Sequence, residues 1–128
     1  MAEVEREVVV PATPEDVWTS LTDPDELTRW FGADVWGDLE PGGTAVFRED
    51  DGTVRRAVVE EADAPRRLTF RWWPEGGEQW PSRVAYELDE VPGGTRLRVI
   101  ERLLVPTAST AWEARLSGLR MHLCSCRV

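Results

Sequence analysis

The stretch TPEDVWTSLTDPDELTRWFG, residues 13–32, carries the signals of two short helices in immediate succession. Thr13 is a suitable N-cap, Pro14 fits the first helical position, and Asp16 follows where a carboxylate compensates free backbone N–H groups. The same arrangement recurs from Asp23, and a glycine follows the second helix. Helices of about two turns are unstable on their own. We therefore expect both helices to pack against a broad surface, such as a sheet.

The segments on either side of this stretch predict that sheet. Apolar and polar residues alternate within them, and Pro-Gly-Gly or Asp-Gly turns separate several of them, as is typical of antiparallel hairpins. The expected strands span residues 4–10, 34–40, 44–50, 53–61, 67–73, 83–89 and 95–103.

One longer helix is expected after Pro106, with its N-cap near Thr107 or Ser109. Its apolar residues recur at the helical period, so that it can cover one face of the sheet. The order of elements predicts an α+β fold. In this fold a curved antiparallel sheet of about seven strands wraps around the C-terminal helix, and the two short helices close one end. The expected apolar stripe consists of Trp112, Leu116, Leu119 and Leu123.

Length and charge restrict the class of protein. The 128 residues fit a single domain, 1–128, with its own core. A formal net charge of −9 disfavours nucleic acid as a partner, because phosphate binding requires a basic surface. No segment has the pattern of a secretory signal or the ~20 apolar residues of a membrane span, so we expect a cytoplasmic protein. A homodimer is left open.

Four segments also carry a resemblance to a known family. They are VPATPEDVWTSLTDPDELTRWFG (10–32), EPGG (40–43), APRRLTFRW (64–72) and ELDEVPGGTRLRVIE (87–101), and the first is the most specific. The chain resembles the START-like, or SRPBCC, superfamily, whose fold is the helix-grip or Bet v 1-like fold. Within it, the sequence is most similar to bacterial single-domain proteins related to the activator of the heat-shock-protein ATPase.

The resemblance implies a cavity between the curved sheet and the last helix. Superfamily members use this cavity for lipids, sterols, polyketide intermediates or other apolar small molecules, but the fold does not imply one reaction. Seven Trp residues indicate a large aromatic core, a lined cavity, or both. The residues that we expect at a ligand site are Phe47, Arg56, Trp72, Tyr86, Glu101, Trp112 and Leu116.

Glu101 is the acid of most interest, because alternation from Leu97 and Val99 places it on the inward face. A carboxylate there could act as a general acid or base or anchor a ligand. Alternatively, it pairs with an inward arginine such as Arg56, or lies at the open rim. Arg55 and Arg56 are consecutive, so one of them must point inward if the strand is regular.

His122, Cys124 and Cys126 are close together in the sequence but do not predict a metal site. On a helix the two cysteines lie about 160° apart, and zinc usually takes four ligands. The sequence has no P-loop and no dinucleotide-binding fingerprint, so we expect no cofactor.

Three functions remain open at this point. The first is binding of a hydrophobic or aromatic small molecule in the cavity. The second is an enzyme similar to polyketide cyclases or aromatases, with proton transfer by Glu101 or Tyr86. The third is a co-chaperone that contacts a heat-shock ATPase. The expected single domain weighs against the third, because the namesake activator also has an N-terminal domain. Glu101 is the one polar group placed inward with conviction, which favours binding over catalysis.

Overall fold

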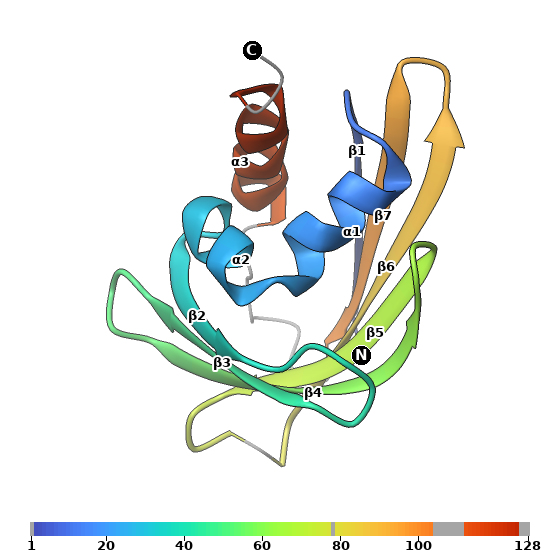
Figure 1. Cartoon of the computed structure of the whole chain (residues 1–128). Coiled ribbons are helices and arrows are strands. Elements are labelled where there is room, and N and C mark those ends of the chain that lie inside the picture. Colours follow the sequence, from blue (N-terminus) through green and yellow to red (C-terminus); the bar gives the residue numbers. More distant parts are fainter. Residues whose placement is uncertain (1, 78, 104–111, 126–128) are drawn as a thin grey trace.

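The computed structural model describes residues 2–77, 79–103 and 112–125 (Figure 1). Within these ranges the chain forms seven strands and three helices. The elements are β1 (Ala2–Val10), α1 (Pro14–Thr22), α2 (Pro24–Trp30), β2 (Ala33–Gly37), β3 (Thr44–Glu49), β4 (Val54–Asp63), β5 (Arg67–Pro74), β6 (Ser82–Val91), β7 (Gly94–Leu103) and α3 (Trp112–Ser125).

The strands form one antiparallel sheet in the order β1-β7-β6-β5-β4-β3-β2. From β2 to β7 each strand pairs with its neighbour in the chain, and β1 pairs with β7 at one edge of the sheet. Figure 1 shows that the sheet curves into a trough, with α1 and α2 crossing its open side and α3 standing beside them. This arrangement confirms the predicted helix-grip fold. No helix in the described ranges is long and apolar enough to cross a membrane.

The two short helices begin as predicted. Thr13 caps α1, and its hydroxyl accepts a hydrogen bond from the backbone N–H of Asp16 at 3.2 Å. Asp23 caps α2, and its carboxylate accepts from the backbone N–H groups of Asp25 and Glu26. Asp23 ends α1 and begins α2, so both helices are short. At the end of α2, Phe31 contacts Phe47 of the sheet.

Strand boundaries differ from the prediction at β2, which ends at Gly37 rather than at residue 40. Gly37 has φ +123°, and a Cβ there would lie 2.4 Å from the carbonyl oxygen of Thr44. The last residue of β2 must therefore be glycine, because a side chain would clash with the backbone of β3. The predicted N-cap of the last helix at Thr107 or Ser109 lies outside the described residues.

The apolar stripe of α3 faces the interior as predicted, and Trp112, Leu116, Leu119 and Leu123 are all buried. Gly118 lies next to Leu119 of this stripe and faces the end of α2. A Cβ atom added at Gly118 would lie 2.8 Å from the carbonyl oxygen of Trp30. The absence of a side chain at Gly118 therefore sets how closely α3 approaches the end of α2.

Replacing Gly118 by alanine should destabilise the protein although it improves helix propensity. Inside a helix, alanine is more favourable than glycine by about 1 kcal/mol of folding free energy. Forcing a Cβ against a backbone carbonyl costs about 1–3 kcal/mol, so we expect a net loss of about 1 kcal/mol in urea denaturation. Ser117→Ala, at the exposed neighbouring position, should be neutral or slightly stabilising. A stabilised Gly118→Ala variant would show that α3 is free to move away from α2.

Candidate functional site

Six aromatic rings fill the space between the sheet and the helices. The centroids of neighbouring rings lie 5.1–6.0 Å apart, and most pairs meet edge to face, as aromatic side chains prefer. Two rings belong to the helix side and four to the sheet. The helix side provides Phe31 and Trp112, and the sheet provides Phe47, Phe70, Trp72 and Tyr86.

Glu101 lies at the centre of this cluster on β7 and is fully buried. The indole N–H groups of Trp72 and Trp112 each donate a hydrogen bond to one of its carboxyl oxygens, both at 2.8 Å. The inward orientation predicted from strand alternation is therefore confirmed. The prediction that Glu101 pairs with Arg56 is wrong, because the indole N–H groups of Trp72 on β5 and Trp112 on α3 bind the carboxylate instead.

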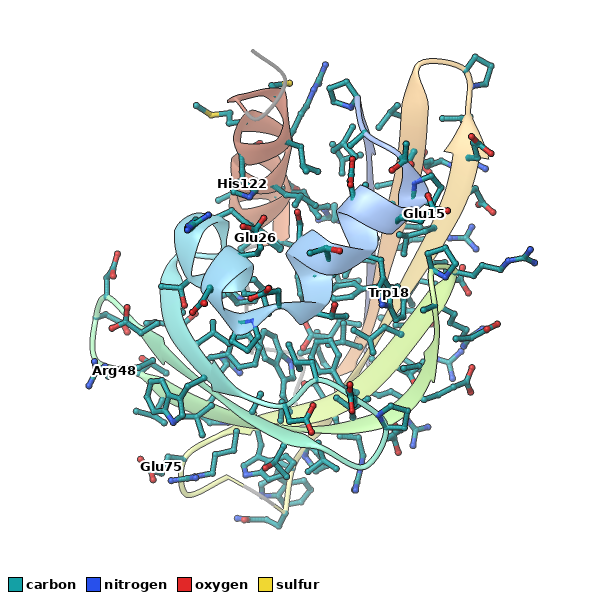
Figure 2. The ribbon with its side chains drawn as sticks, in the orientation of Figure 1. Glu15, Trp18, Glu26, Arg48, Glu75 and His122 are labelled. Atoms are coloured by element: carbon teal, nitrogen blue, oxygen red, sulfur yellow. The ribbon has the colours of Figure 1, made fainter. Side chains whose placement is uncertain are left out.

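Of the consecutive arginines on β4, Arg55 points inward and Arg56 outward. Arg56 donates to a carboxyl oxygen of Glu75 at 3.1 Å, and Figure 2 shows Glu75 on the outer side, by the connection that follows β5. Arg56 is thus removed from the interior, contrary to the prediction. The guanidinium of Arg55 lies 5.0 Å from the ring of Trp72, over its face. Alternation alone could not decide which of the two side chains points inward.

Arg115 is an interior residue that sequence reasoning missed. Its guanidinium lies 4.3 Å from the ring centroid of Phe31 and also faces Trp72 and Trp112. It forms an ion pair with Glu49 at the end of β3. Burial lowers the pKa of Arg115, and Glu49 opposes that effect. The sequence did contain one indication of this position: Arg115 follows Trp112 by three residues, which places both on the same helical face.

Among the described residues, two donors in this interior find no acceptor. These donors are Nε of Arg55 and Nη1 of Arg115. Both atoms are buried, and neither has a hydrogen-bond partner in the described part of the chain. Both guanidiniums approach the same carboxylate, because Nε of Arg55 lies 3.9 Å from the second oxygen of Glu49. Unsatisfied buried donors are rare in folded proteins and call for an explanation.

The remaining predicted residues lie on the same inner surface. Phe47, Trp72, Tyr86, Trp112 and Leu116 are all buried. Burial raises the pKa of the Tyr86 phenol above its ordinary value, so the hydroxyl stays protonated and can only donate or accept a hydrogen bond at neutral pH. The structure therefore brings six of the seven predicted ligand-site residues together, and Arg56 is the exception.

Two hollows among the described residues lie outside the ring cluster. One, of about 760 Å³, lies between the β6–β7 hairpin, the start of α1 and Leu123. The other, of about 590 Å³, lies between the α1–α2 junction and the connection from β2 to β3. The cavity expected between the sheet and α3 is occupied, in the described part of the chain, by the rings themselves.

The candidate metal residues do not converge. His122 lies beside Glu26 of α2, with Nε2 and a carboxyl oxygen 3.0 Å apart, so that it joins two helices (Figure 2). Cys124 is exposed, and Cys126 lies outside the described residues. The described ranges hold no group of three or more histidine, cysteine or acidic residues arranged to bind a metal ion.

Comparison with known families identifies the chain. The model of the family described as "Activator of Hsp90 ATPase homolog 1-like protein" matches residues 11–122. The chain belongs to this family. No curated protein matches the sequence.

Three solved structures share the fold of this Hsp90-activator-like chain. CalU16 from Micromonospora echinospora is 29% identical over 94% of this chain and 74% of its own, with a TM-score of 0.71. DynU16, from the dynemicin biosynthetic locus, is 24% identical over 97% of this chain, with a TM-score of 0.86. The chain spans only 48% of DynU16. The Aha1 dimer from Colwellia psychrerythraea is 22% identical over 96% of both chains, with a TM-score of 0.81.

Proposed function

We propose that the protein binds an apolar or aromatic small molecule between the curved sheet and α3. The observation that carries the proposal is a pair of guanidinium donors, on Arg55 and Arg115, that residues 2–77, 79–103 and 112–125 leave without an acceptor inside an aromatic interior. Replacing buried charges by apolar residues of similar volume is often neutral or stabilising. An interior made for stability alone therefore has no need of Arg55, Arg115, Glu49 and Glu101, and a ligand explains why they are there.

Binding requires the rings of the two sides to separate. Phe31 and Trp112 move with the helices, while Phe47 and Trp72 are fixed by the sheet. A flat molecule that enters between these layers would replace ring–ring contacts by similar contacts of its own. Opening therefore displaces α2 and α3 and also loosens the links from α3 to the sheet, the hydrogen bond from Trp112 to Glu101 and the ion pair between Arg115 and Glu49.

The proposal predicts that Leu116→Trp prevents binding of a neutral aromatic probe. Leu116 is buried on the inner face of α3, so an indole at this position would occupy the space that the probe needs. Titration with the fluorescent probe N-phenyl-1-naphthylamine should give an affinity at least ~10-fold weaker than that of the wild type, the loss of about 1.4 kcal/mol.

Met121→Trp is the matched control, because residue 121 lies on the same helix with 71% of its surface exposed. It should bind the probe as the wild type does, and circular dichroism should show that both variants are folded. Equal binding by the two variants, or no binding by the wild type, would contradict a site on the inner face. Native mass spectrometry of the purified protein would show which compounds it retains.

An enzymatic role for Glu101 has less support than binding. Both oxygens of its carboxylate already accept indole N–H groups, so it is held in place rather than presented to a substrate. Tyr86 is buried beside the same cluster and stays protonated at neutral pH. The polar groups fit the positioning of a ligand better than proton transfer.

Two further properties are proposed from the relatives. The family description supports an interaction with a heat-shock ATPase as the alternative function, which stimulation of Hsp90 ATPase activity by the purified chain would test. The Aha1 relative from Colwellia is a dimer, and we extend this to a homodimer here, which sedimentation equilibrium would test.

A further inference from the structure

We infer that the ligand carries a neutral acceptor oxygen, as in an aromatic ketone, which accepts hydrogen bonds from Arg55 and Arg115. The inference rests on the proposed function and names the chemical class of the ligand. It starts from the two donors that the described part of the chain leaves without an acceptor, Nε of Arg55 and Nη1 of Arg115. A ligand that enters the ring cluster meets these donors, and an oxygen acceptor would satisfy them.

The two donors belong to one locus rather than to separate places. Both guanidiniums approach the carboxylate of Glu49, Arg115 at one oxygen and Arg55 at the other. Both also lie over the ring of Trp72, with distances from the guanidinium carbon to the ring centroid of 5.0 Å for Arg55 and 5.5 Å for Arg115. The two guanidiniums therefore share both the carboxylate of Glu49 and the ring of Trp72.

Charge balance determines which kind of oxygen fits. Among the described residues, the ring cluster and its border hold two guanidiniums, Arg55 and Arg115, and two carboxylates, Glu49 and Glu101. Each carboxyl oxygen of Glu101 accepts one indole N–H group, from Trp72 and from Trp112. The four charges already cancel, so a ligand carboxylate would bring an additional buried charge with no counter-ion, which is costly. A carbonyl oxygen accepts the same hydrogen bonds without adding charge.

The rest of the ligand is set by the surrounding rings. Arg115 stacks on Phe31, and Trp72 stacks on Trp112 with an angle of 28° between the ring planes. A flat aromatic body can continue this stack while its carbonyl points toward the guanidiniums. A saturated lipid would leave both the stacking surfaces and the donors unused.

Three compounds with the same fused-ring frame and different groups at carbon 9 test the inference: fluorene, 9-fluorenone and fluorene-9-carboxylate. Affinities are measured by displacement of N-phenyl-1-naphthylamine from the wild type and from Arg55→Met, Arg115→Met and Arg56→Met. We expect the wild type to bind fluorenone at least ~10-fold more tightly than fluorene, and more tightly than the carboxylate. The preference should fall below ~3-fold in Arg55→Met and Arg115→Met and persist in Arg56→Met, whose side chain points outward.

The infrared carbonyl stretch of bound fluorenone gives a second readout that does not depend on stability. It should shift to lower wavenumber in the wild type and less so in Arg55→Met, because a hydrogen bond weakens the C=O bond. Equal binding of fluorene and fluorenone, or tightest binding of the carboxylate, would overturn the inference while the proposed function stood. If none of the three compounds displaced the probe, the inference would be overturned. If the probe itself did not bind, the proposed function would fail as well.

Discussion

Glu101→Ala is expected to lower the free energy of unfolding by about 3–5 kcal/mol, the cost of removing one partner from a buried charged network. The carboxylate is fully buried and accepts the indole N–H groups of both Trp72 and Trp112. Without it, two buried donors lose their acceptor and the interior gains a net positive charge from Arg115 and Arg55. Urea denaturation followed by circular dichroism measures the change.

Glu3→Ala is the control for this prediction. Glu3 forms an ion pair with Arg102 at 3.0 Å, but both side chains are more than half exposed. Its removal should change stability by less than about 1 kcal/mol, as is usual for surface pairs. Similar effects of the two substitutions would mean that Glu101 is not the centre of the interior network.

Trp72→Ala is expected to destabilise the protein by about 3–5 kcal/mol, the range for truncation of a large buried aromatic side chain. Its ring is fully buried and contacts the rings of Phe31, Phe47, Phe70 and Trp112. Its N–H also donates to Glu101, so truncation removes a hydrogen bond together with the packing. Guanidinium chloride titration followed by fluorescence gives the change.

Trp80→Ala removes the same side chain from the surface, where 58% of Trp80 is exposed. We expect a change within about 0.5 kcal/mol. A loss of stability in Trp80→Ala that matched that of Trp72→Ala would contradict the assignment of Trp72 to the core. Trp72→Phe separates packing from hydrogen bonding, because it keeps a ring but no donor.

Periodicity was sufficient to predict most of the fold. Alternation along the strands placed Leu97, Val99 and Glu101 on one face, and all three are buried. Capping signals located the two short helices to within a residue, because Thr13 and Asp23 have few alternative roles before proline. The end of β2 was less predictable, since it depends on contact between Gly37 and Thr44 across the hairpin.

The candidate site was predicted less well, because it depends on contacts between distant segments. Sequence could show that either Arg55 or Arg56 points inward, but the choice depends on the register of β4 against its neighbours. Arg115 was overlooked because a charged residue beside an apolar stripe usually lies at its solvated border. Its partner Glu49 is 66 residues away in the chain, so no local pattern links them.

The most direct test of a ligand site in the ring cluster is an NMR titration of the ¹⁵N-labelled protein with 9-fluorenone. Indole N–H signals, assigned by single Trp→Phe variants, report on each tryptophan separately. We predict that fluorenone shifts the indole N–H signals of Trp72 and Trp112 and the Nε–H signal of Arg55. The indole signals of the exposed Trp36 and Trp80 should not shift. Shifts confined to Trp36 and Trp80, or no shift at saturating fluorenone, would contradict a site between the sheet and α3.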